Sequence, residues 1–368
     1  MAAPSHPTQV RRVARLALVL GLAAALLSLA PAAQAHSARH QRTAYRQTNL
    51  VSDVPGRATL TDPNLVNAWG LAAGPATPMW VADNGTDKST LYNGAVNGSP
   101  PAIVPLVVNV PGAPTGLVFN GQAGFNVSAG GVTAPARFIF ATESGTILGW
   151  APNLPLNGNA QLTATVPGAI YKGLAIATSD SGTFLYAANF HDNRIDVFDS
   201  TFSLVHLEGS FRDRHLPRGY APFNVQELGG KLYVAYAKQD ADHADEVAGR
   251  GRGFVDVFDL SGHLLRRLIS RGQLNAPWGL VIAPNGFGQF SGDLLVGNFG
   301  DGRIHAYDLR GHFRGTLRDE HRRPIEIDGL WALRFGNGVI GTPTTLLFSA
   351  GPDDETHGLF GSIEAVSG

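Results

Sequence analysis

Two stretches of the chain repeat one pattern, ANFHDNRIDVFDSTF at residues 188–202 and GNFGDGRIHAYDLRGHF at residues 297–313. Both have an apolar run before them and a turn after them. In RIDVFD and RIHAYD, apolar and polar residues alternate, which is typical of a β-strand with one buried face. A repeat of this kind predicts an architecture built from equivalent units.

The surrounding phrase recurs in six copies along the chain. Each copy has a first apolar segment, a second apolar segment that ends in a polar loop, and a third, alternating segment. The anchors of the first segments are Gly70, Gly116, Gly173, Asn224, Gly279 and Gly329. Their spacing of about 50 residues leaves room for four short strands per copy, as in a propeller blade. We therefore predict an all-β fold, a six-bladed β-propeller with four-stranded antiparallel blades.

The sixth copy ends with GSIEAV at residues 361–366, and no residues are left for its fourth strand. The segment YRQTNLVS at 45–52 precedes the first copy and has no other assignment. We predict that these two segments pair and close the ring, because an open ring would expose a sheet edge. The propeller domain would then span residues 45–368.

The first 35 residues have the features of a secretory signal. Arg11, Arg12 and Arg15 precede the apolar run 16–30, and PAAQA at 31–35 resembles a cleavage site. The run is too short for a membrane span, so we predict cleavage after Ala35 and a secreted or periplasmic protein without a membrane span. Residues 36–44 are expected to be a disordered N-terminal segment.

Composition excludes several classes of function. The chain has 28 Lys+Arg and 29 Asp+Glu, and loss of the three signal arginines leaves a formal charge of −4, which does not suggest a nucleic-acid partner. Cysteine is absent, so disulfides, thiol nucleophiles and cysteine-ligated metals are excluded. We expect the mature protein to be a monomer.

The phrases resemble NHL-type six-bladed propellers. NAWGLA at 67–72, YAKQDADHADE at 236–246 and GFVDVFDLSG at 253–262 are similar to an uncharacterised family of exported bacterial propeller proteins. The resemblance implies the fold and export. It implies no reaction, because function depends on the site and not on the fold.

The loops after the second strands should all lie on one rim of the propeller, and they are rich in carboxylates and amides. Oxygen ligands suit Ca²⁺ better than Zn²⁺. The residues predicted as calcium ligands are Asp83, Asp240, Asp242 and Asp353. Alternatively, Asp and Asn in these loops hydrogen-bond their own turns. The longest loop, 238–253, is either a solvated mobile segment, a lid or a metal-binding loop.

Ligand binding is predicted at the channel mouth on the same rim. The candidates are Trp69, Asn84, Asn189, Lys238, Trp278 and Asn298. Tryptophans at the mouth would offer flat surfaces to sugar rings, although core packing is their alternative role.

Catalytic candidates are few, because the chain has no G-x-S-x-G elbow and no H-E-x-x-H motif. His191 beside Asp192 could act as a general base. Glu143 and Lys172 are the other candidates, and Lys172 is unusual because a lysine that faces inward needs a partner.

Two classes of function fit these patterns. The first is an exported binding or scaffold protein whose polar rim meets a small molecule, a glycan or an envelope protein. The alternative is a metal-dependent hydrolase, lactonase or lyase with a calcium-type site at the channel mouth.

Overall fold

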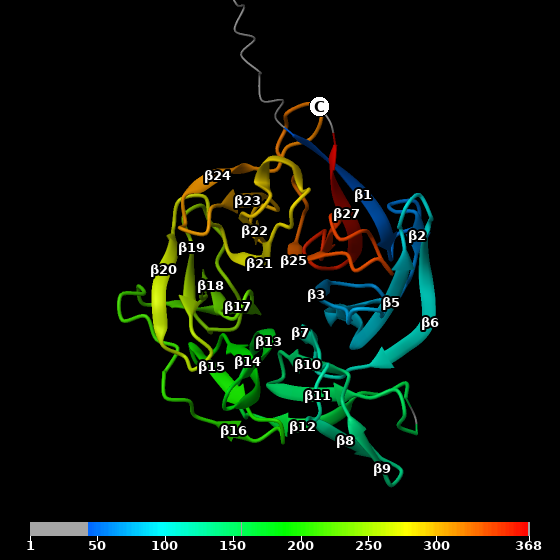
Figure 1. Cartoon of the computed structure of the whole chain (residues 1–368), viewed down its shortest axis with the longest axis vertical. Coiled ribbons are helices and arrows are strands. Elements are labelled where there is room, and N and C mark those ends of the chain that lie inside the picture. The colour runs from blue at the N-terminus through cyan, green and yellow to red at the C-terminus, as the bar shows by residue number, and fades with distance from the viewer. Residues whose placement is uncertain (1–42, 156, 367–368) are drawn as a thin grey trace, which may run out of the picture. The chain divides into compact units, whose positions relative to one another are not determined.

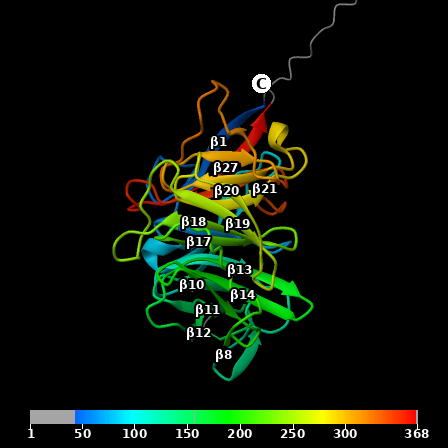
Figure 2. The same ribbon diagram turned by 90° about the vertical axis from the view of Figure 1, so that its left-hand side faces the viewer.

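The structure of the protein is a computed structural model that describes residues 43–155 and 157–366. The predicted signal peptide and most of the 36–44 segment lie outside these residues. The described part is a ring of six antiparallel sheets, which confirms the predicted six-bladed β-propeller (Figure 1). In a view turned by 90°, the sheets of neighbouring blades lie next to one another (Figure 2). Within the described residues, no helix is long and apolar enough to cross a membrane.

Each blade is a meander of four strands, numbered from the axis outward. Blade 1 contains β3 (Ala68–Ala72), β4 (Met79–Asp83), β5 (Lys88–Gly94) and β6 (Pro101–Asn109). Blade 2 contains β7 (Pro114–Phe119), β10 (Phe138–Thr142), β11 (Thr146–Trp150) and β12 (Gln161–Thr165). Blade 3 contains β13 (Tyr171–Ser179), β14 (Gly182–Asn189), β15 (Arg194–Phe198) and β16 (Leu204–Val205).

The second half of the ring follows the same order. Blade 4 contains β17 (Tyr220–Glu227), β18 (Leu232–Lys238), β19 (Gly253–Phe258) and β20 (Leu264–Ser270). Blade 5 contains β21 (Pro277–Ile282), β22 (Leu294–Asn298), β23 (Ile304–Tyr307) and β24 (Phe313–Thr316). Blade 6 contains β25 (Leu330–Phe335), β26 (Leu346–Ala350), β27 (Leu359–Val366) and β1 (Ala44–Ser52).

The ring is closed as predicted, because β1 pairs with β27 in antiparallel register, with Tyr45 opposite Ala365 and Ser52 opposite Leu359. The strand begins at Ala44, one residue before the predicted boundary. Tyr45 and Val51 are fully buried, so the closing strand also contributes to the core. A two-residue strand, β2 (Leu60–Thr61), adds to β1 in parallel.

A hairpin between the first and second strands of blade 2 was not predicted. It consists of β8 (Asn126–Ala129) and β9 (Val132–Pro135), joined by Gly130 and Gly131. Both glycines have positive φ, which a two-residue hairpin turn of this type requires. The Gly-Gly pair flanked by short alternating segments is the sequence signal that would have identified it.

The anchor glycines of the repeat are explained by the close approach of first strands around the axis. A Cβ atom on Gly70 would lie 2.5 Å from the Thr115 carbonyl oxygen, and one on Gly279 would lie 2.8 Å from Leu333 Cγ. These distances are too short for any side chain. In blade 6, Gly329 is not the equivalent residue, because it precedes β25 with a φ of 63°. Ala332 has the anchor position, since the residue before it, Trp331, packs with the tryptophans of blades 1 and 5.

The residues immediately before the anchors surround the axis, and we call them the axial ring. They are Trp69, Thr115, Lys172, Phe223, Trp278 and Trp331. Trp69 stacks on Trp331 with ring centroids 3.4 Å apart, and Trp278 meets both rings edge-on. The cavity beside the anchors has a volume of only about 10 Å³. The aromatic members therefore close the channel as a packed core.

Candidate functional site

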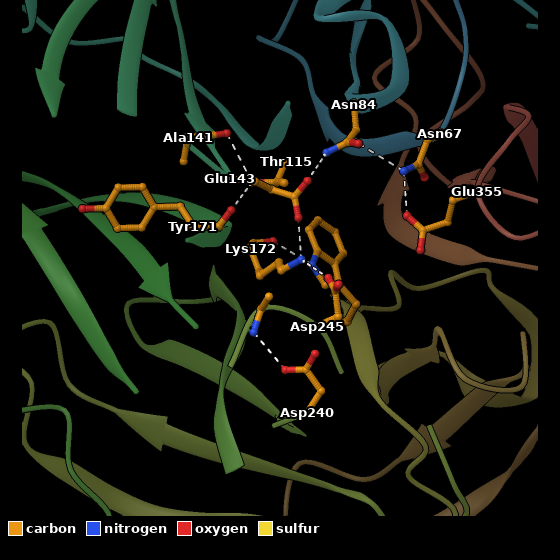
Figure 3. A network of polar contacts seen from close by, with 12 residues as sticks. Asn67, Asn84, Thr115, Ala141, Glu143, Tyr171, Lys172, Asp240, Asp245 and Glu355 are labelled. Atoms are coloured by element: carbon orange, nitrogen blue, oxygen red, sulfur yellow. Dashed lines mark hydrogen bonds and ion pairs between the residues drawn. The ribbon is translucent and has the colours of Figure 1, made fainter. Parts of the chain in front are cut away.

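Six polar side chains form one network at the channel mouth (Figure 3). They lie on the rim that carries the loops after the second strands, and we call them the mouth network. Its members are Asn67, Asn84, Glu143, Lys172, Asp245 and Glu355. They come from blades 1, 2, 3, 4 and 6, so the network exists only when the ring is complete.

Lys172 is the centre of the network and the one charged member of the axial ring. Its side chain is 1% exposed, and its Nζ lies 2.5 Å from Glu143 Oε1 and 2.9 Å from Asp245 Oδ1. The ammonium group also lies over the Trp69 ring, 5.3 Å from its centroid. Burial opposes the charge of Lys172, but the two carboxylates outweigh it, so the pKa of Lys172 is raised and the group is charged.

A chain of amides extends the network from blade 2 to blade 6. Asn84 donates to Glu143 Oε2 at 2.9 Å, and Asn67 donates to Asn84 Oδ1 at 3.2 Å and to Glu355 Oε2 at 2.6 Å. Asn67 Oδ1 accepts a hydrogen bond from Trp331 Nε1 at 3.1 Å. The polar mouth is therefore bonded directly to the aromatic core beneath it, which fixes its geometry.

Burial, together with an excess of acidic groups over the single lysine, raises the pKa of two carboxyl groups at the mouth. Burial is the main cause that raises the pKa of Glu246 to about 8, and the carboxylates of Glu355 and Asp245 add to the effect. Burial also raises the pKa of Glu355, although its hydrogen bond from Asn67 opposes the shift. A carboxyl group whose pKa is raised toward neutrality by burial in a cleft is a feature of functional sites.

The long loop 238–253 is held against the mouth by hydrogen bonds along its length. Gln239 donates to the Phe190 carbonyl oxygen at 2.6 Å, and Ala244 N donates to Asp240 Oδ1 at 2.9 Å. The amide of Asp240 donates to the Asp245 carbonyl oxygen at 2.8 Å, which turns Asp245 toward Lys172. The loop thus contributes the Asp245 side chain to the mouth network. Its role as a lid or as a metal-binding loop stays a prediction.

The predicted ligand-binding residues are divided between the site and the core. Asn84 belongs to the mouth network, whereas Lys238 lies over the Tyr220 ring, with Nζ 5.6 Å from the ring centroid. Trp69 and Trp278 are each 2% exposed, so core packing is their role in the structure.

Asn189 and Asn298 are fully buried and serve their own loops. Asn189 donates to Asp192 and Asp196, and Asn298 donates to the Gln273 carbonyl oxygen and to Asp301. Their amides thus have partners within the fold, as the alternative of turn stabilisation predicts.

Two of the predicted catalytic residues, Glu143 and Lys172, are brought together as an ion pair. His191 and Asp192 do not form a pair that could act as a base, because Asp192 binds Arg194 and Asn189 instead. His191 Nδ1 is buried without a hydrogen-bond partner in the described part of the chain, and the ring lies 6.1 Å from that of His243.

The predicted calcium ligands are dispersed. Asp83 is fully buried, and burial raises its pKa well above the usual value. Asp353 pairs with Arg57 at 2.7 Å, and Asp240 caps its own loop, while Asp242 is exposed. In residues 43–155 and 157–366, no three His, Cys, Asp or Glu side chains are grouped to hold a metal ion. Calcium binding stays a prediction.

The predicted site residues did not include four residues of this region, Asn67, Asp245, Glu246 and Glu355. Asp245 and Glu246 stood in the longest loop, and Asn67 preceded the first strand of blade 1. The signal that could have found them is Lys172, because a buried lysine needs carboxylates from neighbouring loops of the same rim.

Comparisons with known proteins agree with the fold. No model of a known protein family matches the chain, so the likeness to NHL repeats stays a prediction. The chain is 34% identical over 338 residues to an uncharacterised protein of Acanthamoeba polyphaga mimivirus, covering 88% of this chain and 81% of the viral protein. This relative is viral, whereas bacterial relatives were expected.

Two solved propellers superpose on the chain. A virginiamycin B lyase of Staphylococcus aureus with quinupristin has a TM-score of 0.51 at 11% identity and covers 88% of this chain and 100% of its own. A gluconolactonase of Xanthomonas campestris has a TM-score of 0.48 at 12% identity and covers 82% of this chain and 87% of its own. At 11% identity the likeness to the lyase concerns the fold alone.

Proposed function

We propose that the chain, which belongs to the same family as the uncharacterised mimivirus protein and folds as a six-bladed propeller, is a binding or scaffold protein whose ligand sits at the mouth network. We also propose that it acts outside the cytoplasm, on the strength of the signal-like residues 1–35.

The observation that carries this proposal is the ion-paired, buried Lys172 at the point where the blades converge. Burying a lysine is costly, and three other blades have a tryptophan at the same position, Trp69, Trp278 and Trp331. Lys172 is charged in this position, and a long loop brings Asp245 to it. This arrangement supports a ligand-binding role for Lys172 and not a purely structural one.

The chemistry of the mouth favours a hydroxyl-rich ligand. Carboxylates of Glu143, Asp245 and Glu355 accept hydrogen bonds from hydroxyl groups, and the half-buried Phe299, stacked on Trp331 with centroids 4.1 Å apart, adds an aromatic surface. This combination of acceptors and aromatic surface suits a sugar better than an apolar molecule or a nucleic acid. A glycan of the cell envelope is the ligand class that we propose.

The test is binding of the secreted form, residues 36–368, to an array of bacterial envelope polysaccharides. The double variant Glu143→Gln/Asp245→Asn should lose binding, because both partners of Lys172 lose their charge. The matched control is Asp180→Asn, an exposed acid in the β13–β14 turn on the opposite rim. Equal binding by the wild type and the double variant, or loss in the control as well, would contradict the proposal.

A second candidate function is supported by Glu246. A carboxyl group with a pKa of about 8 can donate a proton near neutral pH, as a general acid does. The chain would then be a hydrolase, lactonase or lyase. A turnover screen with lactones and glycosides would show a rate that falls at least about 100-fold in Glu246→Gln. If the wild type showed no turnover, the binding function would be the one proposal that remains.

A further inference from the structure

A second polar groove lies between the outer strands of blades 5 and 6 and shares no residue with the mouth network. It has a volume of about 670 Å³, within the range of small-molecule sites. The groove is lined by Thr43, Gln289, Phe290, Arg314, Gly315, Thr316, Arg318 and Arg322. Three of these residues are arginines and none is acidic.

The acidic residues nearest in sequence are engaged elsewhere. Asp319 pairs with Arg323 at 2.7 Å, and Glu320 pairs with Arg46 at 2.9 Å. Arg314 has one distant partner, Asp293, with 3.8 Å between Nε and Oδ2. The positive charge of the groove is therefore left largely uncompensated by the described residues around it.

The groove is built from a fixed backbone. Tyr45 N donates to the Arg318 carbonyl oxygen at 2.9 Å, and Gln289 N donates to Thr43 Oγ1 at 3.0 Å, so blades 5 and 6 are joined here. Arg318 itself donates to the Arg322 carbonyl oxygen at 2.7 Å, which holds the 317–327 hairpin in place. The arginine side chains thus project from a braced scaffold.

Gly315 keeps the floor of the groove open. Its φ is 156°, and a Cβ atom there would lie 2.9 Å from the Phe290 ring. Beside it, Thr316 Oγ1 lies 2.9 Å from Nδ1 of His305, and burial lowers the pKa of His305 to about 4. The imidazole is neutral at pH 7, so it adds no charge but can orient the threonine hydroxyl group.

We propose that this groove is a binding site for a compact multivalent oxyanion, a phosphate or polycarboxylate group of a small molecule. Guanidinium groups bind such oxygens in a bidentate manner, and several of them on one braced surface add to the affinity. The threonine hydroxyl and the absence of lining carboxylates suit the same ligand class.

The test is isothermal titration of residues 36–368 with inorganic phosphate and, separately, with citrate, at constant ionic strength. The double variant Arg314→Gln/Arg322→Gln should weaken binding at least tenfold. The matched control, Arg212→Gln/Arg310→Gln, removes two charges from exposed positions outside the groove and should bind as the wild type does. Both double variants lack the same formal charge, so a nonspecific charge effect would weaken both equally.

Binding of phosphate alone identifies a phosphate-bearing ligand, and binding of citrate alone identifies a polycarboxylate, and either result supports the site. No binding of either anion by the wild type would overturn the proposal, as would equal weakening in the two double variants. Glycan binding at the mouth is a separate measurement and should be unchanged in both.

Discussion

Equivalent places on one rim are occupied by the repeated loops of blades 3 and 5 and by the unrepeated loops of blades 2 and 4. The side chains of the two kinds of loop make different contacts. Asn189 and Asn298 stand in the repeated loops, and their amides bond within their own blades. Glu143 and Asp245 stand in the loops that depart from the repeat, and both cross to Lys172 in blade 3.

This difference indicates how the sequence is divided between architecture and function. Residues that recur in the blades satisfy the backbone and pack the sheets, as a repeat unit must. Residues that depart from the repeat are the ones that link blades at the mouth. Lys172 illustrates the point, because Trp69, Trp278 and Trp331 have its position in three other blades.

The largest effect is expected from removing the closing strand. Deletion of residues 36–52 takes away β1, whose Tyr45, Leu50 and Val51 are buried, and exposes the edge of β27. Loss of that burial should lower the free energy of unfolding by about 5 kcal/mol or more. Chemical denaturation measures it, and a truncated protein as stable as the full one would disprove ring closure as an essential feature.

The next largest effect is a pH dependence of stability caused by Glu246, which lies in a loop that departs from the repeat. Its pKa is about 8 in the folded state and near its ordinary value of 4.5 when unfolded, so the folded state holds a proton that the unfolded state releases. Stability should therefore fall as pH rises from about 4.5 to 8, by roughly 2 kcal/mol after allowance for its partial exposure.

Glu246→Gln should abolish this slope and be more stable than the wild type at pH 8, whereas Asp242→Asn, an exposed acid of the same loop, should retain it. Denaturation curves at several pH values provide the measurement. Parallel pH profiles for the wild type and Glu246→Gln would count against the raised pKa.

A smaller effect is expected from a repeated residue. Asn298→Ala leaves the Gln273 carbonyl oxygen and the amide of Asn275 without partners in a buried place, which should cost about 1–3 kcal/mol. Ligand binding at the mouth should be unchanged in the folded fraction. If Asn298→Ala lost ligand affinity as the Glu143→Gln/Asp245→Asn double variant is expected to, the division between repeated and unrepeated residues would fail.

Calcium should give the smallest effect. At concentrations of one to ten times a millimolar dissociation constant, binding would add only about 0.4–1.4 kcal/mol of stability. The double variant Asp240→Asn/Asp242→Asn should lose that increment in thermal scans with calcium and with chelator. An equal response of the wild type and the double variant would place the ion at other residues. No response in either protein would contradict calcium binding.

The architecture could be predicted from the sequence because the same strand and turn patterns recur along the chain. The alternation in RIDVFD and RIHAYD, the anchor glycines and the unpaired segment 45–52 each follow from local geometry that recurs. The anchor of blade 6 was misplaced because Ala332 replaces glycine there, and Gly329, three residues earlier, offered a false match.

The site could be predicted only in part. Lys172 and Glu143 were identified singly, as residues that need partners, but their pairing depends on which loops meet across the axis. Asp245 reaches Lys172 across 73 residues of sequence. Such a contact follows from the turn of the 238–253 loop and not from any periodicity, and the roles of Asn67 and Glu355 depend on the same convergence.

The coupling of charged groups at the channel mouth can be measured by an NMR titration of the Glu246 side-chain carboxyl carbon in the wild type and in Lys172→Met. We expect a pKa of about 8 in the wild type and a higher pKa in the variant, because the charge of Lys172 lowers the pKa of Glu246. A pKa near 4.5 in the wild type, or one that does not respond to the loss of Lys172, would contradict a coupled site at the channel mouth.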